Sequence, residues 1–144
     1  MIIRTAQSSD IEPVETLLSS SDLPLEGVAE NFDEFVVADD NGEIAGVIGL
    51  ERFGSAALLR SAVVTPDQRG TGIGARLVEQ LLDRARKSGV SEIYLLTTTA
   101  ENYFPRFGFA RTTRDAVPDP VKQSAEFKGA CPDTAIVMAR QLDA

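Results

Sequence analysis

Twelve residues near the middle of the chain, VVTPDQRGTGIG (63–74), constrain its fold more than any other segment. They follow an apolar run, AALLRSAVV (56–64), and precede an amphipathic run that extends to Ser88. This order predicts a strand, a glycine loop and a helix in succession. Because glycines carry no Cβ, a ligand can approach the backbone amides at the start of the helix. Such a loop is typical of a phosphate or pyrophosphate site, and the alternative is a plain flexible turn.

Two common nucleotide-binding motifs do not fit this segment. A P-loop ends in Lys followed by Ser or Thr, whereas Ala75 and Arg76 follow Gly74 here. Residues 70–75 match the glycine pattern of dinucleotide-binding folds, which comes directly after the first strand of a parallel sheet. Here three or more expected strands precede it, and Glu92, the acid near the expected distance, lies before the next strand instead of after it. The dinucleotide interpretation is therefore rejected.

The composition excludes several kinds of chemistry. With no histidine and one cysteine, the chain cannot contain a Ser-His-Asp triad, a His-ligated metal or an intramolecular disulfide. Acidic residues outnumber basic ones by 22 to 14, and the net charge of −8 argues against a nucleic-acid partner. No apolar run is long enough to cross a bilayer, and the charged start, MIIRTAQSSD, is unlike a signal peptide. We expect a cytoplasmic protein that binds neither nucleic acid nor membrane.

The apolar patterning predicts a mixed α/β chain folded as one domain, residues 1–144. Ser9 and Glu12 have capping-box spacing at the start of a first helix, and Asn41-Gly42 is a strong hairpin signal. The expected strands start at Ile2 and at Phe109 and span 35–39, 44–53, 56–64, 93–97 and 134–141; the expected helices span 9–19, 72–88, 100–107 and 120–128. The early strands should form an antiparallel meander, and later crossovers should add parallel pairing.

The glycine segment also matches the coenzyme A motif [RQ]xxGx[GA], as Arg69 to Gly74. A second stretch follows at a suitable spacing, with Thr97, Ala100, Phe104, Gly108 and Phe109 at its key positions. On these residues the chain resembles the GCN5-related N-acetyltransferase (GNAT) superfamily over nearly its whole length. The resemblance implies antiparallel N-terminal strands and a splayed parallel pair at the cofactor cleft. It also implies acetyl-CoA as co-substrate, without a metal.

The resemblance further implies where the cofactor binds. The pantetheine arm should pair with the backbone of the strand before the loop, and the pyrophosphate should bind the loop amides. The short helix that follows Thr97 should line the other wall of the cleft. The expected cofactor contacts are Val63, Val64, Arg69, Gly70, Thr71, Gly72, Ile73, Gly74, Asn102, Phe104 and Arg106.

The implied reaction is direct attack of a neutral amine on the thioester in a ternary complex, which needs a base, an oxyanion donor and a proton for the sulfur. Glu51 is the first candidate base, with a solvated hairpin carboxylate as the alternative. Phe104 occupies the usual position of the superfamily's tyrosine, so Tyr103 or Ser61 is the candidate acid, unless water protonates the sulfur. One residue along a helix is a rotation of about 100°, which would turn Tyr103 away unless the helix is distorted.

Three stretches, 58–66, 94–109 and 125–135, resemble the N-acetyltransferases associated with arsenic-resistance operons. This resemblance implies a small amine or amino-acid acceptor and a link to arsenic resistance. Two other functions stay open: a protein or peptide N-acetyltransferase, and a non-catalytic acyl-CoA-binding sensor, which the missing tyrosine suggests. A homodimer is also left open.

Four further residues bear on the acceptor. Arg60 is a candidate partner for a substrate carboxylate, with a surface salt bridge as the alternative. It should point to the opposite face of its strand from Ser61 unless a bulge intervenes. Leu23 and Glu26 lie in a loop expected to cover the acceptor. Cys131 alone supplies one thiolate, too few for a trivalent arsenical, and is expected to be a small apolar residue beside a proline turn.

Overall fold

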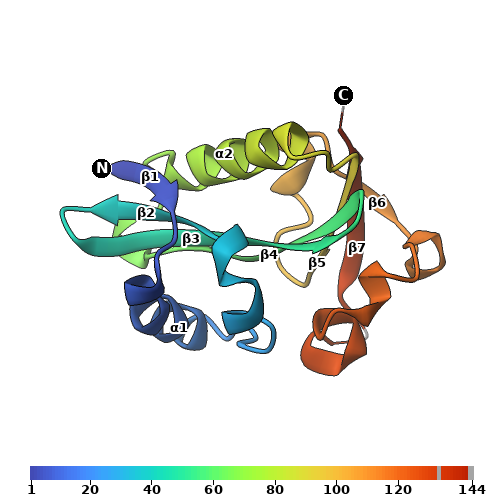
Figure 1. Cartoon of the computed structure of the whole chain (residues 1–144), viewed down its shortest axis with the longest axis horizontal. Helices are drawn as coiled ribbons and strands as arrows, with labels where there is room; N and C mark the ends of the chain where they lie inside the picture. The colour runs from blue at the N-terminus through green and yellow to red at the C-terminus, as the bar shows by residue number, and fades with distance from the viewer. Residues whose placement is uncertain (133, 143–144) are drawn as a thin grey trace.

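The computed structural model describes residues 1–132 and 134–142, whose strands form one seven-stranded sheet in the order β1-β2-β3-β4-β5-β7-β6 (Figure 1). The strands are β1 (Ile2–Thr5), β2 (Val36–Asp40), β3 (Glu43–Phe53), β4 (Ala56–Val64), β5 (Glu92–Thr97), β6 (Ala110–Thr112) and β7 (Ile136–Gln141). The longer helices are α1 (Ile11–Ser20) and α2 (Ile73–Lys87). Short 3-10 turns span Ser8–Asp10, Ala29–Glu34, Pro66–Gln68, Phe104–Phe107, Arg114–Ala116 and Val121–Gln123, and a π-helical turn spans Glu126–Ala130.

The parallel pairing within this sheet is confined to β4 and β5. Only Ala56–Leu58 of β4 pairs with Glu92–Tyr94 of β5, although β4 continues to Val64. All the other paired strands in the described part of the chain are antiparallel. The predicted fold class, a mixed α/β sheet with antiparallel N-terminal strands and a splayed parallel pair, is confirmed.

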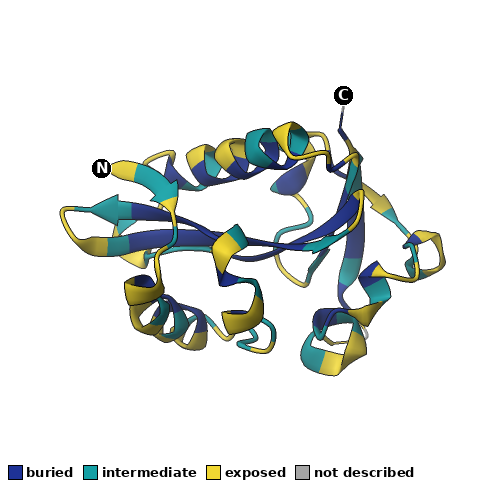
Figure 2. Cartoon of the chain, viewed as in Figure 1, coloured by how far each residue is buried: buried dark blue, intermediate teal, exposed yellow. Residues whose placement is uncertain are grey.

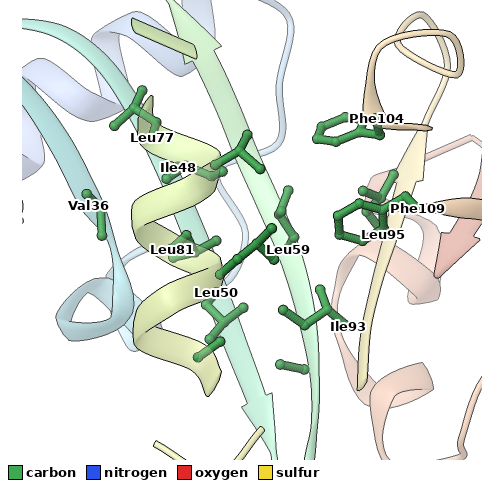
Figure 3. Packing of buried hydrophobic residues seen from close by; sticks show 14 of the residues in the cluster. Val36, Ile48, Leu50, Leu59, Leu77, Leu81, Ile93, Leu95, Phe104 and Phe109 are labelled. Carbon is green, nitrogen blue, oxygen red and sulfur yellow. The ribbon is translucent and has the colours of Figure 1, made fainter. Parts of the chain in front are cut away.

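Helix α2 covers one face of the sheet (Figure 1). It carries apolar residues at helical spacing, so one stripe is apolar and packs on the strands. Leu77 and Leu81 lie toward Ile48, Leu50 and Leu59 of β3 and β4 (Figure 3). All five side chains are almost fully buried, and they fix where the helix begins relative to the end of β4.

Helix α1 and the Ala29–Glu34 turn cover the opposite face (Figure 1). Val14 and Leu18 of α1 pack there with Phe35, Val37 and Val47 in a second apolar cluster. The central strands are therefore buried on both faces (Figure 2), which explains why β3 reads as a nearly continuous apolar run.

The start of α1 differs from the expected capping box. The Asp10 carboxylate accepts a 2.7 Å hydrogen bond from the Gln7 amide and pairs with Arg4 of β1, also at 2.7 Å. The helix begins after Asp10, at Ile11, and Ser9 belongs to the preceding 3-10 turn. The prediction of a Ser9–Glu12 box was wrong because Gln7 and Asp10 form the capping box two residues earlier, and Arg4 holds the Asp10 carboxylate there.

Two expected helices are shorter than predicted. The span 120–128 is divided at Ser124, whose extended backbone (ψ 143°) lets its hydroxyl donate to the Glu51 carboxylate at 2.9 Å. In the span 100–107 only Phe104–Phe107 is helical. There the Ala100 amide donates to the Thr97 hydroxyl at 2.9 Å, a side-chain bond that competes with helix formation.

Candidate functional site

A pocket of about 440 Å³ opens where β4 and β5 diverge. Its wall comes from the second half of β4, the end of β5 with the turn that follows it, the start of α2 with its loop, the C-terminal segment, and the loop after α1. The lining includes Leu59–Val64, Arg69, Gly74, Leu77, Val78, Leu95–Ala100, Tyr103, Phe104, Glu126, Ala130–Pro132, Ala135 and Ser21–Pro24. Because β4 has no β5 partner beyond Leu58, its edge is available to a ligand in this pocket.

The glycine loop approaches this pocket from the start of α2. Gly70 and Gly72 have φ angles of +82° and +87°, which side chains other than glycine rarely adopt, and the space around both is open. The Arg69 side chain lies across the loop, with Nε donating to the Val64 carbonyl at 3.2 Å. Open amides at the N-terminus of a fifteen-residue helix, with a guanidinium beside them, suit a phosphate group.

A bulge in β4 shapes the middle of the pocket wall. The pairing of β3 with β4 shifts between Val47 and Gly49, and Ser61 has a φ of +58°. This bulge brings Arg60 and Ser61 to the same pocket, with Arg60 Nε 3.1 Å from Ser61 Oγ. Strained backbone of this kind is common at binding and catalytic sites.

Tyr103 and Phe104 have different surroundings, although both line the pocket. Phe104 is buried and packs edge-on against Phe109 in the core. The Tyr103 hydroxyl extends toward the glycine loop: an ideal Cβ on Gly74 would lie 3.0 Å from it. Tyr103 is the residue before the 3-10 turn Phe104–Phe107, and the start of this turn leaves room at the pocket for both aromatic side chains. Burial raises the pKa of Tyr103, so its hydroxyl stays protonated at neutral pH.

A buried cluster of charged side chains borders the pocket beside Ser61. The Arg60 guanidinium, whose side chain is 0% exposed, pairs with Glu51 at 2.6 Å and with Glu126 at 3.4 Å. The Arg60 guanidinium also donates to the Pro24 carbonyl at 3.3 Å. Arg60 and Glu126 line the pocket, whereas Glu51 is not part of its lining. One guanidinium therefore serves two carboxylates, and only one of those carboxylates faces the cavity.

Burial, and secondly the neighbouring negative charge, changes the ionisation of Glu126 and Cys131. Burial, together with the charges of Glu51 and Glu26, raises the pKa of Glu126 to about 7, although Arg60 and a hydrogen bond with Cys131 act in the opposite direction. Burial and the neighbouring Glu126 raise the pKa of the Cys131 thiol to about 12. Cys131 is therefore a neutral thiol at physiological pH and a poor nucleophile or metal ligand.

The other predicted site residues fall into three groups. Leu23, Val63 and Val64 line the pocket, as do Arg69 and Gly74. Ile73 is buried in the core. The remaining ones, Glu26, Gly70, Thr71, Gly72, Asn102 and Arg106, are exposed and lie outside the lining. Arg106 stacks on the Tyr103 ring at 4.5 Å, so it contacts the site through that side chain.

Glu126 is the residue that sequence reasoning missed. Its neighbours Ala125 and Phe127 make an apolar setting unusual for a surface carboxylate, and that was the only local signal. Its place in the charged cluster depends on Glu51 of β3 and Arg60 of β4, which are far away in the sequence.

Within 1–132 and 134–142, no group of three or more carboxylates or cysteines is arranged to hold a metal ion. Over the same ranges, each helix is too short or too polar to cross a membrane.

An open sheet whose one parallel pair splays beside a glycine loop defines the acyl-CoA N-acyltransferase class of folds. Comparison with known proteins gives the family directly, because residues 4–109 match the model of the Acetyltransferase (GNAT) family. The chain belongs to this family.

Individual relatives agree with the family match. The chain is 34% identical over 114 residues to an amino-acid acetyltransferase from Ralstonia nicotianae, covering 76% of this chain and 25% of that protein. It is 26% identical over 140 residues to an amino-acid acetyltransferase from Neisseria meningitidis, covering 88% and 31% of the two. The chain thus spans about a third or less of these relatives. Among solved structures, Rv2747 from Mycobacterium tuberculosis in complex with CoA superposes with a TM-score of 0.85 at 26% identity, covering 99% of this chain and 100% of that one.

Proposed function

We propose that this chain is an acetyl-CoA-dependent N-acetyltransferase that acetylates the amine of a small, amino-acid-like acceptor. The observation that carries the proposal is the unpaired edge of β4 beyond Leu58, which faces the same pocket as Gly74 and Glu126. A thioester arm can pair with that edge while its phosphates bind the loop. An acceptor amine can then reach the thioester from the side of Glu126. The amino-acid acetyltransferases among the relatives support the choice of acceptor.

The proposed cofactor contacts follow from this arrangement. The amides of residues 69–74 bind the pyrophosphate, Arg69 folds over it, and the backbone of Val63 and Val64 pairs with the pantetheine. Coenzyme A in the M. tuberculosis structural neighbour supports this assignment. Asn102 and Arg106, which are both exposed, stay proposed contacts of the cofactor.

The proposed reaction joins the acceptor nitrogen to the thioester carbonyl carbon and breaks the bond from that carbon to sulfur. Backbone amides at the β4 bulge near Ser61 stabilise the oxyanion. As the intermediate collapses, the thiolate gains a proton from the Tyr103 hydroxyl, which faces the start of α2. The second amine proton passes from the nitrogen to solvent water, and the Tyr103 phenolate takes a proton back from solvent. Ser61 is the alternative donor.

The structure makes the roles expected for Arg60, as a substrate contact, and for Glu51, as a base, harder to fulfil. Because the Arg60 guanidinium is buried and already pairs with two carboxylates, it can bind a substrate carboxylate only by releasing one of them. Glu51 binds Arg60 and Ser124 and is not part of the pocket lining, so a direct role as base would need a rearrangement. Leu23 is the proposed acceptor contact from the N-terminal side.

Several finer assignments rest on the sequence alone. They are the link to arsenic resistance, the cytoplasmic location, the homodimer and the organisation of residues 1–144 as one domain. The arsenic link is testable by including an organoarsenical amino acid among the acceptors.

The proposal is tested by calorimetry with acetyl-CoA and CoA, followed by thiol-release assays over simple amines, amino acids and short peptides. We expect binding of both cofactors and saturable thiol release with at least one small acceptor. Release only with peptides would contradict the small acceptor, and binding without release with any acceptor would favour a sensor.

A further inference from the structure

We propose that Glu126 is the catalytic base that takes the proton from the acceptor's ammonium group, with Arg60 and Glu51 as positioning residues that hold its carboxylate at the pocket wall. This inference rests on the proposed acetyl transfer and names a residue on the β6–β7 segment in place of the strand carboxylate Glu51.

The first argument is access. Glu126 lies in the π-helical turn Glu126–Ala130 and lines the pocket together with Arg60, Ser61 and Cys131. Glu51, the other carboxylate of the cluster, is absent from this lining and receives hydrogen bonds from Arg60 and Ser124. Of the two, only Glu126 can meet an amine in the cavity.

The second argument is geometry. Arg60 Nη1 binds Glu51 at 2.6 Å, while Arg60 Nε lies 3.4 Å from Glu126, so the guanidinium holds Glu51 more closely. The Glu126 backbone amide donates to Ser124 Oγ at 3.2 Å, which anchors the turn on the same cluster. Glu126 is 4% exposed and is held in place by these contacts. Its carboxylate can still accept a proton, because its pairing with Arg60 is the looser of the two.

The third argument is charge. If both carboxylates were ionised, one guanidinium would face two negative charges in a buried setting. An entering ammonium group supplies the missing positive charge, and proton transfer to Glu126 then leaves a neutral amine beside a neutral acid. The proton balance is simple: the ammonium loses one proton to Glu126, and the carboxyl later returns it to solvent. A pKa near 7 for Glu126 suits a base that works at neutral pH.

The groups that face Glu126 predict its pH behaviour. Glu51 of β3 and Glu26 of the N-terminal loop raise its pKa by like charge, whereas Arg60 of β4 and the Cys131 thiol lower it. Because the carboxylate is the active form, kcat/KM should rise with pH through an ionisation near 7. Removing the Glu51 charge should move that ionisation to lower pH.

The test is the pH profile of thiol release with the best small acceptor. Glu126→Gln should lower kcat about 100-fold or more and abolish the ionisation near neutral pH, with CoA affinity by calorimetry unchanged. Glu51→Gln should shift the ionisation to lower pH, a change that loss of a merely structural contact would not produce. Asp119→Asn, which removes an exposed carboxylate from the same segment, is the matched control and should leave the profile unchanged.

The outcomes separate this inference from the proposed function. If the wild type turns over and Glu126→Gln has the same rate and pH profile, the assignment of the base is overturned while the proposed acetyl transfer stands. Acetyl-CoA binding without wild-type turnover would overturn acetyl transfer and the base with it. If Glu126→Gln fails to fold, Glu126→Asp decides instead: the ionisation should persist at a reduced rate, and an unchanged rate would contradict the proposal.

Discussion

At the residue scale, the adjacent side chains of Tyr103 and Phe104 occupy different places in the site. Its neighbour Phe104 occupies the position where the superfamily's tyrosine is expected, but Phe104 is buried against Phe109. The Tyr103 hydroxyl, by contrast, extends toward Gly74 at the start of α2. A phenol one residue earlier in the chain, at the start of the Phe104–Phe107 turn, therefore reaches the cleft.

We expect Tyr103→Phe to lower kcat by about tenfold or more, because the thiolate loses its proton donor. CoA affinity should be unchanged, since the ring and its contact with Arg106 remain. Tyr94→Phe is the control: its hydroxyl bonds Glu92 at 3.2 Å, outside the pocket lining. Thiol-release assays on both variants make the comparison, and equal rates in the two would remove Tyr103 from the mechanism.

At the element scale, the junction of β4 with α2 determines what the site can bind. The strand loses its parallel partner after Leu58, bulges at Ser61 and ends in a loop with two left-handed glycines. Each step exposes backbone groups that a regular strand and helix would have paired internally.

Gly72→Ala should weaken CoA binding about tenfold or more, because a methyl group would face the phosphates and the φ of +87° would be strained. The strain alone should lower the free energy of unfolding by about 1–2 kcal/mol. Gly42→Ala is a matched control in the β2–β3 turn, with a φ of +93° and open space around it. It should show a similar loss of stability in urea unfolding with CoA affinity unchanged in calorimetry. Equal CoA affinity in both variants would contradict the phosphate role of the loop.

At the scale of the whole molecule, the sheet has one apolar cluster on each face, and its central strands β3 and β4 also carry residues of the site. Leu77 and Leu81 of α2 pack on one face (Figure 3), while Phe35 and Val47 belong to the cluster on the other. Gly49 lies in β3 and pairs with Arg60 of the neighbouring strand β4.

Gly49→Ala should destabilise the fold by about 1–3 kcal/mol, because the new Cβ would lie 2.3 Å from the fully buried Phe35 ring. Gly46→Ala on the same strand should have a smaller effect, since its new Cβ would lie 2.9 Å from the end of the Leu77 side chain and 3.2 Å from the Val63 carbonyl oxygen. Urea unfolding of both variants measures the difference. A larger loss in Gly46→Ala would mean that the Phe35 face tolerates the extra methyl.

Much of the fold was predictable because it depends on local patterns. The apolar stripe of α2, the Asn41-Gly42 hairpin and the long apolar run of β3 each identify one element on its own. The Ser9–Glu12 box was wrong because Gln7 and Asp10 form the box instead. The helix over 120–128 is divided because Ser124 within it binds Glu51, which is distant in the sequence.

The candidate site divides in the same way. Sequence by itself determined the glycine loop and the coenzyme A motif, because consecutive backbone groups that bind phosphate need only a short stretch of chain. Tertiary structure alone decided which carboxylate reaches the pocket, since Glu51, Arg60 and Glu126 meet only when β3, β4 and the C-terminal segment pack together. The physical reason is that a buried charge takes its ionisation from neighbours in space, and those neighbours are distant in the sequence.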